Sequence, residues 1–372
     1  MKILILHAYS SKNRGDGLLV DETIDTLRIA YGNDVSFLVV AMDQRSFTDT
    51  KNVKYIQYQP ASSNLKERLS GLLNLLLSPR RLGFDKNAWI THFSDAPSLI
   101  VAVGGGYMRT TGYKQQLKFV LSHCMQLLYS SGQKVPTIYF PQSVGPLKGP
   151  VGFFVRKKMS KLTRVYLRDD RSMDELHQCT NTVRSPDLAV LKLADTTPPV
   201  HKNTKYTLLV VRDVEKSSAI RDKYIKSLLE LYRTIPNCIP VLQSEGRGNN
   251  DRLFYDELEF GGVYPFIVDA IKEYSPSAVV SVRLHGALQS ILDGIPTIHL
   301  SYERKGFGAY TDLGVAEFVH NAFNFDPSLI VRQLEELHSN PQAAFWQKIE
   351  DGLKNVAKVK ECVIKDIKDV VA

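Results

Sequence analysis

Residues 278–306, AVVSVRLHGALQSILDGIPTIHLSYERKG, decide the fold of this chain. The apolar, β-branched run Ala278–Val282 predicts a buried strand, and a polar turn is expected over residues 283–286. Helical spacing then predicts a helix over Ala287–Leu292, and a second buried strand follows over Pro296–Leu300. The stretch therefore predicts a βαβ unit with parallel strands.

Polar side chains follow both strands of this unit. Arg283 and His285 follow the first strand, and the loop 301–306, with Tyr302 and Lys305, follows the second. Ligands of parallel sheets bind at the carboxyl ends of the strands, and cations beside a helix N-terminus suit an anion. We interpret this edge as an anion site. The alternative is that the turn has no ligand. In many turns of this kind the arginine forms an ion pair and the histidine lies on the surface.

Composition limits the class of protein. The chain has 372 residues, of which 44% are hydrophobic and 23% charged, so we expect a soluble globular protein with room for two domains. The sequence has no run of eighteen apolar residues, so we expect no membrane-spanning helix. The N-terminus resembles a first strand more than a signal peptide. The cysteines have no paired spacing, which indicates reduced thiols and a cytoplasmic protein; they are Cys124, Cys179, Cys238 and Cys362.

The net charge of +8 fits an anionic small substrate, an anionic membrane surface, nucleic acid or a mildly basic solvated surface. No nucleic-acid-binding motif is present, so we expect no nucleic-acid partner. Two basic segments could contact a membrane peripherally. Residues 65–84 carry leucines at helical spacing flanked by Lys and Arg, which fits a helix that covers the sheet or one that lies on a membrane. Val151–Arg164 is the second segment.

Strands alternate with helices along the whole chain, which predicts mainly parallel sheets. Further strands are expected at 2–8, 35–41, 53–57, 99–103, 136–140, 164–167, 206–211, 238–243 and 316–319. Further helices are expected at 18–31, 114–130, 218–233, 264–274, 328–338 and 341–370. The proline-rich stretch 195–205 is a linker. We therefore expect an α/β protein with two Rossmann-like domains, 1–195 and 205–330, and C-terminal helices over 331–372 that could pack back on the first domain.

Other polar motifs lie near the ends of predicted strands. They are Asn13-Arg14-Gly15-Asp16, Gly104-Gly105-Gly106, Pro141-Gln142-Ser143-Val144-Gly145-Pro146, Arg168-Asp169-Asp170-Arg171-Ser172 and Pro186-Asp187-Leu188-Ala189. Each alone is weak, because a glycine or a capping aspartate is common in turns. Their value lies in their order along the chain.

In that order the motifs resemble the polysaccharide pyruvyltransferase family. The most specific part is the C-terminal signature, on which fall Ser281, Arg283, Leu284, His285, Gly294, Pro296, Tyr302 and Lys305. This chain has Gly286 where many members have alanine or serine. The resemblance implies two Rossmann-like domains that face each other across a cleft, similar to the B-type glycosyltransferase (GT-B) fold.

The resemblance also implies an activity. Such enzymes transfer pyruvate from phosphoenolpyruvate to two hydroxyls of one sugar, giving a cyclic ketal on a cell-surface polysaccharide or its lipid-linked precursor. The implied partners are phosphoenolpyruvate and a glycan or lipid-linked acceptor, at the cytoplasmic face of the membrane. No cofactor or metal is expected.

Roles follow for the donor side, which we expect in 205–330. Arg283 would contact the carboxylate or phosphate, and His285 would transfer a proton, because imidazole titrates near neutral pH. The resemblance implies a second donor contact from an upstream arginine, which we assign to Arg168 because it lies in the R-D-x-x-S element, with Arg212 as the competing candidate. The remaining donor contacts are predicted at Leu284, Tyr302 and Lys305.

The acceptor side is expected in 1–195. Asn13 and Asp16 would face the acceptor sugar there, with Asp16 as a base. Gly105, Gly106 and Gln142 are predicted to line the substrate site, since glycines at the end of a strand allow close approach to the backbone.

Two other functions remain open. A glycosyltransferase using a nucleotide sugar would bind its donor at the same edge, with Glu303 on the ribose, but would leave the Arg-Leu-His motif without a clear role. A non-enzymatic basic protein would explain the charge and none of the motifs.

Overall fold

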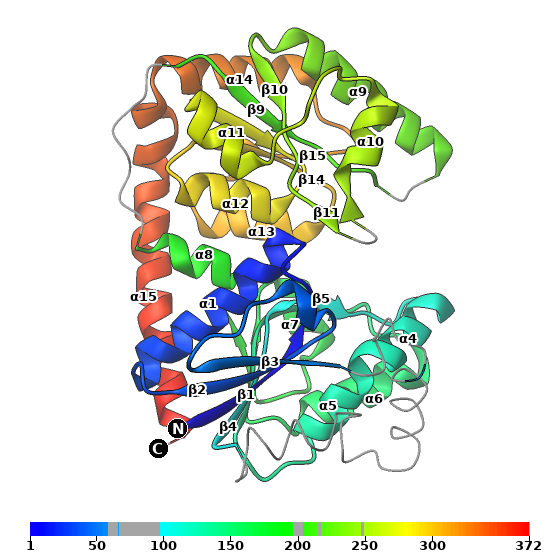
Figure 1. Cartoon of the computed structure of the whole chain (residues 1–372), viewed down its shortest axis with the longest axis vertical. Coiled ribbons are helices and arrows are strands. Elements are labelled where there is room, and N and C mark those ends of the chain that lie inside the picture. The colour runs from blue at the N-terminus through cyan, green and yellow to red at the C-terminus, as the bar shows by residue number, and fades with distance from the viewer. Residues whose placement is uncertain (59–65, 67–96, 196–203, 215–216, 247–248, 372) are drawn as a thin grey trace. The chain divides into compact units, whose positions relative to one another are not determined.

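The computed structural model describes residues 1–58, 66, 97–195, 204–214, 217–246 and 249–371 (Figure 1). The chain forms two compact units. Unit 1 comprises Met1–Ser11, Asp16–Leu188 and Glu361–Ala372, and unit 2 comprises Lys12–Gly15 and Ala189–Lys360. Both units are discontinuous, whereas the predicted ranges 1–195, 205–330 and 331–372 follow one another along the chain.

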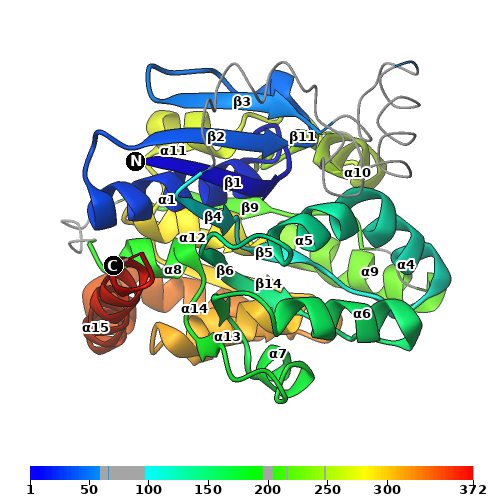
Figure 2. The ribbon, with the colours of Figure 1, turned by 90° about the horizontal axis from the view of Figure 1, so that it is seen from below.

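Unit 1 is built on an eight-stranded sheet in the described residues, with the order β3-β2-β1-β4-β6-β7-β8 and β5 paired to β6 (Figure 2). All of its strand pairs are parallel. The strands are β1 Lys2–Ala8, β2 Ser36–Ala41, β3 Val53–Gln57, β4 Leu99–Ala102, β5 Gly105–Met108, β6 Thr137–Val144, β7 Arg164–Leu167 and β8 Thr182–Arg184. The inner strands are buried on both faces, as parallel strands covered by helices require.

The helices of unit 1 pack their apolar residues on this sheet. They are α1 Arg14–Tyr31, α4 Tyr113–Phe119, α5 Met125–Ser130, α6 Gly149–Met159, α7 Asp170–Glu175 and α8 Leu188–Leu193, with a π-helical turn between α4 and α5. Phe119 of α4 and Val155 and Met159 of α6 share one core cluster with Tyr139 of β6. The two helices therefore cover the same part of the sheet.

Unit 2 has a five-stranded parallel sheet with the order β10-β9-β13-β14-β15. Its strands are β9 Thr207–Val210, β10 Cys238–Pro240, β13 Ala278–Ser281, β14 Thr297–Ser301 and β15 Val319–Asn321, beside a short antiparallel pair, β11 Glu245–Gly246 and β12 Asn249–Asn250. Its helices are α9 Ser218–Thr234, α10 Asp251–Leu258, α11 Ile267–Tyr274, α12 Leu284–Leu292, α13 Arg304–Asp312, α14 Pro327–Ser339 and α15 Gln347–Asp369. The two mainly parallel sheets confirm the predicted fold class.

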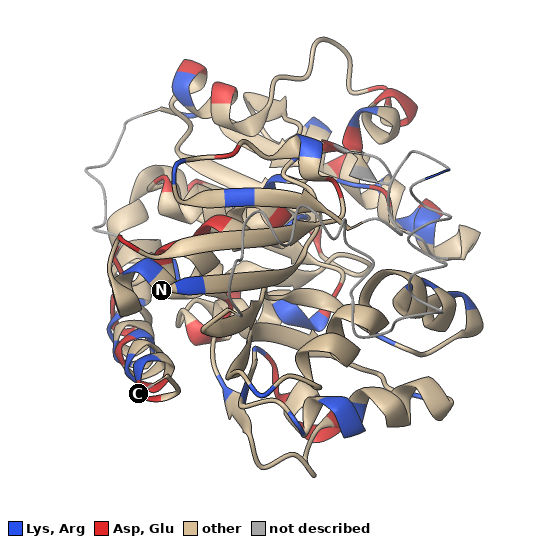
Figure 3. Ribbon diagram, turned by 60° about the horizontal axis from the view of Figure 1, so that its bottom comes forward, with Lys and Arg blue, Asp and Glu red and all other residues tan. Residues whose placement is uncertain are grey.

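The last helix, α15, contributes to the core of each unit separately. It carries Lys and acidic residues in alternation (Figure 3). In unit 2, Gly352 lies against the carbonyl of Leu313, where a side chain would not fit. In unit 1, Asp366 pairs with Arg164 at 2.8 Å, and the Tyr31 hydroxyl donates to the Ile367 carbonyl at 2.5 Å.

Several predicted turns are in fact parts of helices. The predicted turn 283–286 is wrong, because α12 begins at Leu284 with Arg283 as its N-cap. Buried Leu284 continues the apolar helical spacing of Ala287 and Leu288, so packing favours an earlier start. In the same way, α13 begins at Arg304 inside the predicted loop 301–306.

The N-terminal motif is also helical, since α1 begins at Arg14 and not near Leu18. The predicted loop after Phe140 is a continuation of β6 to Val144, and Gly105 and Gly106 lie in β5. Between the predicted strand 238–243 and the predicted helix 264–274, the structure has β11, β12 and α10, which were not predicted. Asp326 caps α14, because its carboxylate accepts from the Ser328 N–H, so this helix starts one residue before the predicted range 328–338.

The predicted helix 65–84 and most of the linker 195–205 lie outside the described residues. None of the helices described has the length and apolar character needed to cross a bilayer. All four cysteines are free thiols.

Candidate functional site

Three neighbouring strands of unit 2 end in predicted site residues. Arg212 follows β9, Arg283 follows β13 and Tyr302 follows β14, and these strands are adjacent in the sheet. Arg212 Nη1 donates to the Tyr302 hydroxyl at 2.9 Å, and its guanidinium carbon lies 5.1 Å from the centre of the Tyr302 ring. The carboxyl edge of the sheet therefore collects two guanidinium groups, as the sequence predicted for this kind of edge.

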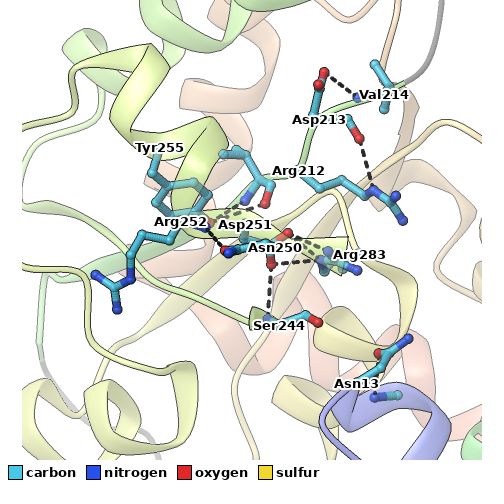
Figure 4. Close-up of polar contacts among 12 residues, drawn as sticks. Asn13, Arg212, Asp213, Val214, Ser244, Asn250, Asp251, Arg252, Tyr255 and Arg283 are labelled. Carbon is cyan, nitrogen blue, oxygen red and sulfur yellow. Dashed lines mark hydrogen bonds and ion pairs between the residues drawn. The ribbon is translucent and has the colours of Figure 1, made fainter. Parts of the chain in front are cut away.

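A buried ion pair holds Arg283 (Figure 4). Its Nε lies 2.9 and 3.1 Å from the two carboxylate oxygens of Asp251, and Nη2 donates to the same carboxylate. Arg283 is 8% exposed and Asp251 only 1%. Burial raises the pKa of the Asp251 carboxyl, and the charges of Arg283 and Arg212 oppose that rise. Since the pair occupies Nε and Nη2, Nη1 retains donors that the pair does not use.

Two backbone segments support Asp251. Asn250 caps α10 by accepting from the Arg252 N–H, which fixes Asp251 in the first turn. The Ser244 N–H donates to the Asp251 carboxylate at 3.1 Å, and the Asp251 N–H donates to the Ser244 carbonyl at 2.9 Å. Ser244 in turn forms an antiparallel β-bridge with Asn13 (Figure 4). Asn13 is therefore linked to Asp251 of the ion pair through the backbone of Ser244.

Gly15 leaves room for the side chain of His285. A Cβ atom on Gly15 would lie 2.5 Å from His285 Nδ1 and 2.8 Å from its Cγ, which no side chain allows. The Gly15 N–H donates to the Asn13 side-chain oxygen at 3.2 Å, and the Arg14 guanidinium lies over the Phe266 ring at 5.0 Å. The glycine of the N-x-G-D element thus provides space for the half-buried imidazole.

Ser281 shapes the start of α12. Its hydroxyl accepts from the Arg283 N–H at 3.2 Å and donates to the Arg283 carbonyl at 2.8 Å. The Ser281 carbonyl lies 2.8 Å from Nδ1 of His299, and since a carbonyl can only accept, Nδ1 carries the hydrogen. His299 is fully buried, and burial lowers its pKa to about 4, helped by Lys305 and His285.

Lys305 lies in the first turn of α13, 3.1 Å from the Glu303 carboxylate. Leu284 is buried at the start of α12, so it supports the helix more than it offers a surface to a ligand. Gly286, the departure from the family pattern, faces Gln243. A Cβ there would lie 3.2 Å from the Gln243 side-chain oxygen and 3.1 Å from the Ser281 hydroxyl, so the glycine leaves room for both.

Unit 1 has a buried guanidinium of its own. Arg168, 4% exposed, donates from Nε to the Ser143 hydroxyl at 2.9 Å and pairs through Nη1 with Asp187. Ser143 donates to Asp169 at 2.6 Å, and Asp169 caps α7. Several of the predicted motifs of this unit therefore converge on one structural network.

The other predicted residues of unit 1 lie near this network or in α1. Gly105 pairs with Gln142 between β5 and β6, and Gln142 is fully buried. A Cβ on Gly106 would lie 3.4 Å from Nη2 of Arg168. Asp16 lies in the first turn of α1, and its role as a base stays a prediction.

Sequence reasoning missed Asp251 and Ser244. Asn250 before the amphipathic stretch 251–258 could have revealed α10, because asparagine is a preferred N-cap. No local pattern indicates the partner of Asp251, which is 32 residues away in sequence.

We predict that removal of one ion-pair partner costs more than removal of both. Asp251→Asn leaves Arg283 buried without its counter-charge and should lower the free energy of unfolding by about 3 kcal/mol in urea titrations. The double variant Asp251→Leu with Arg283→Met should recover most of that loss. As a control, Lys354→Ala, which breaks an exposed pair with Glu350, should leave the free energy of unfolding nearly unchanged. A double variant no more stable than Asp251→Asn would contradict the prediction.

We also predict an acid-sensitive contribution from His299. Its pKa of about 4 in the folded protein lies below the usual 6.5, so only the unfolded chain binds a proton between these values. Stability should therefore fall as the pH drops from 6.5 to 4, by about 3 kcal/mol for this residue. His7 and His123, whose pKa values burial also lowers, add to the total slope. Urea titrations across this pH range should give a smaller slope for His299→Asn, and an unchanged slope would refute this assignment.

Comparison of structures supports the fold. UDP-GlcNAc 2-epimerase from Neisseria meningitidis bound to UDP-GlcNAc has a TM-score of 0.56 at 12% identity, covering 99% of this chain and 100% of that one. UDP-GlcNAc 2-epimerase from Methanocaldococcus jannaschii has a TM-score of 0.53 at 11% identity, covering 99% of this chain and 100% of that one. A trehalose-6-phosphate synthase has a TM-score of 0.57 at 11% identity, with 99% of each chain covered. These matches confirm the predicted GT-B-like fold.

Comparison of sequences identifies the family. No curated protein matches the chain. The family model described as polysaccharide pyruvyl transferase matches residues 13–304, which include Asn13, Arg168, Arg283 and His285. This chain therefore belongs to the polysaccharide pyruvyl transferase family and is a transferase.

Proposed function

We propose that the protein is a ketal pyruvyltransferase. It moves pyruvate from phosphoenolpyruvate to two hydroxyls of one sugar in a polysaccharide or its lipid-linked precursor. One observation carries the proposal. In a chain of this family, a guanidinium held rigidly by a buried carboxylate lies at the N-terminus of α12, and a second guanidinium ends the neighbouring strand.

The charges of unit 2 suit this donor. Phosphoenolpyruvate carries a carboxylate and a phosphate, which bind best to guanidinium groups and to a helix N-terminus. The Arg283 Nη1 group and the half-buried Arg212 supply such donors at one sheet edge. Arg168 is nearly inaccessible and pairs with Asp187. The Arg168 side chain is 2% exposed, against 9% for Arg283, and Arg212 ends the strand next to that of Arg283. Of the two candidates for the second arginine we therefore favour Arg212, and we assign Arg168 to the framework of unit 1.

The proposed reaction removes one proton from each of two sugar hydroxyls, and it delivers one proton to the methylene carbon and one to the departing phosphate. Protonation of the methylene carbon makes C2 of phosphoenolpyruvate electrophilic, and a sugar hydroxyl attacks C2 and loses its proton. The C2–O bond to phosphate then breaks, and inorganic phosphate leaves as it takes up a proton. The second hydroxyl attacks C2, loses its proton and closes the ketal. His285 is the proposed proton carrier, because it lies in the first turn of α12, two residues after Arg283, and Gly15 leaves room for its imidazole.

The acceptor is less defined. Asn13 and Asp16 are proposed to contact the sugar, with Asp16 taking a hydroxyl proton. Asn13 is attached to the ion-pair segment at Ser244, which supports a place for it near the donor.

The alternative is transfer from a nucleotide sugar. It has support from the fold, since the Neisseria epimerase of the same fold binds UDP-GlcNAc. Family membership favours phosphoenolpyruvate, and so does the presence of Arg212 and Arg283 at one edge of the sheet.

We predict phosphate release from phosphoenolpyruvate that depends on an acceptor glycan. His285→Ala should reduce this release at least about 100-fold, in line with the loss of a general acid. Gly15→Ala, whose methyl group collides with the imidazole, should give a similar loss of kcat. Release is measured by a coupled phosphate assay, with ketal formation followed by mass spectrometry.

The exposed His177 provides the control, because His177→Ala should retain full activity. Phosphate release that is unaffected by His285→Ala would contradict the role of this residue. Thermal stabilisation by UDP-sugars but not by phosphoenolpyruvate would favour the alternative function, since a ligand of the folded state raises the melting temperature.

A further inference from the structure

The positive charge of the chain is concentrated in one stretch. Residues 96–168 contain eleven Lys and Arg and no Asp or Glu. The whole chain has 47 basic and 39 acidic residues, so the remainder carries 36 and 39. The excess that gives the chain its net charge of +8 therefore belongs to this stretch, which lies in unit 1.

Within this stretch, α4 and the π-helical turn after it expose an apolar stripe. Tyr113 is 83% exposed, Leu117 50%, and Val120 and Leu121 39% each. Their spacing of four, seven and eight residues puts them on one side of a helix, whereas Phe119 faces the core. A stripe of this kind on a surface helix normally packs against something.

The start of α6 lies beside the start of α4. The Thr110 hydroxyl accepts from the Lys148 N–H at 2.8 Å, just before the two helices begin. Phe153 of α6 is 67% exposed, and Lys157, one turn later, is exposed as well. We call the combined patch the α4–α6 surface. It consists of Tyr113, Leu117, Val120, Leu121 and Phe153 with the exposed lysines Lys114, Lys118, Lys157 and Lys161.

We propose that the α4–α6 surface binds the anionic surface of a lipid bilayer. Apolar and aromatic side chains would enter the boundary between headgroups and acyl chains, and lysines at their edges would contact anionic headgroups. Neither helix contains an acidic residue that would oppose this contact. The inference stands on this surface alone and does not depend on the proposed reaction.

The composition of the surface favours a bilayer over two other anionic or apolar partners. Nucleic acid would satisfy the lysines, but it would leave the aliphatic side chains of Leu117, Val120 and Leu121 exposed to water. A second copy of the chain would cover the stripe, but it would bring two sets of lysines together. A bilayer with anionic lipid complements both the charge and the apolar stripe.

The test is flotation of the full chain with vesicles of phosphatidylcholine containing 30% phosphatidylglycerol or none. The wild-type protein should float with the anionic vesicles only, and less as salt rises. Lys114→Glu with Lys118→Glu should weaken binding by about tenfold or more. Leu117→Ser with Phe153→Ser should weaken it by a similar factor. The matched control is Lys365→Glu with Lys368→Glu, the same charge change on exposed residues of α15, which should bind like the wild type.

Several outcomes would overturn the proposal. They are no flotation with anionic vesicles, flotation that the α4–α6 variants leave unchanged, and equal losses in the α15 control. A dimer in light scattering that Leu117→Ser with Phe153→Ser converts to a monomer, without flotation, would assign the surface to a second copy. A large fall in melting temperature for the same variant, again without flotation, would mean that the chain itself covers the stripe. Because these measurements use no phosphoenolpyruvate, failure of the proposed reaction would leave them intact.

Discussion

The buried ion pair between Arg283 and Asp251 is the constraint on which unit 2 depends. A charge with almost no access to water is tolerated only when a partner and further hydrogen bonds compensate it. Asp251 compensates Arg283, and the backbone of Ser244 compensates Asp251. The pair fixes the direction of the guanidinium before any ligand arrives, so a bound anion would meet a preorganised donor group.

The geometry around Arg283 and His285 explains why several residues of the motifs are of the type found. Ser281 is needed because its hydroxyl closes the turn that presents Arg283. The glycine of the N-x-G-D element is needed because a side chain at residue 15 would occupy the space of His285. In unit 1 the motifs around Arg168 form a comparable network with Ser143 and Asp187. Each unit thus arranges its motifs around one buried arginine at the ends of its strands.

Much of the fold could be predicted from the sequence. Buried parallel strands are continuous apolar runs, so β1, β3 and β7 have the predicted bounds, and β13 ends one residue early. The starts of α1, α12 and α13 could not be predicted, since polar residues and glycines there resemble turns. Tertiary contacts determine where these helices start. Examples are the close approach of Gly15 to His285 and the burial of Leu284.

The positions of the candidate residues could be predicted where these residues follow a strand, and they could not be predicted where two distant segments meet. Arg212, Arg283 and Tyr302 follow three strands, and parallel pairing brings their positions together. The pairing of Arg283 with Asp251 depends on how α10 packs against the sheet, for which the sequence holds no local signal. The preference for Arg212 over Arg168 likewise depends on burial, which residue type does not reveal.

The central claim is that the guanidinium held by Asp251 binds the donor. Calorimetric titration with phosphoenolpyruvate tests it most directly, because each unit has a buried Arg–Asp pair that can be replaced as a whole. The variant Arg283→Met with Asp251→Leu should bind at least about 100-fold more weakly than the wild type, since charge-assisted hydrogen bonds are lost without leaving a buried charge. The variant Arg168→Met with Asp187→Leu should bind phosphoenolpyruvate nearly as well as the wild type. Binding that survives the first replacement and is abolished by the second would contradict the account.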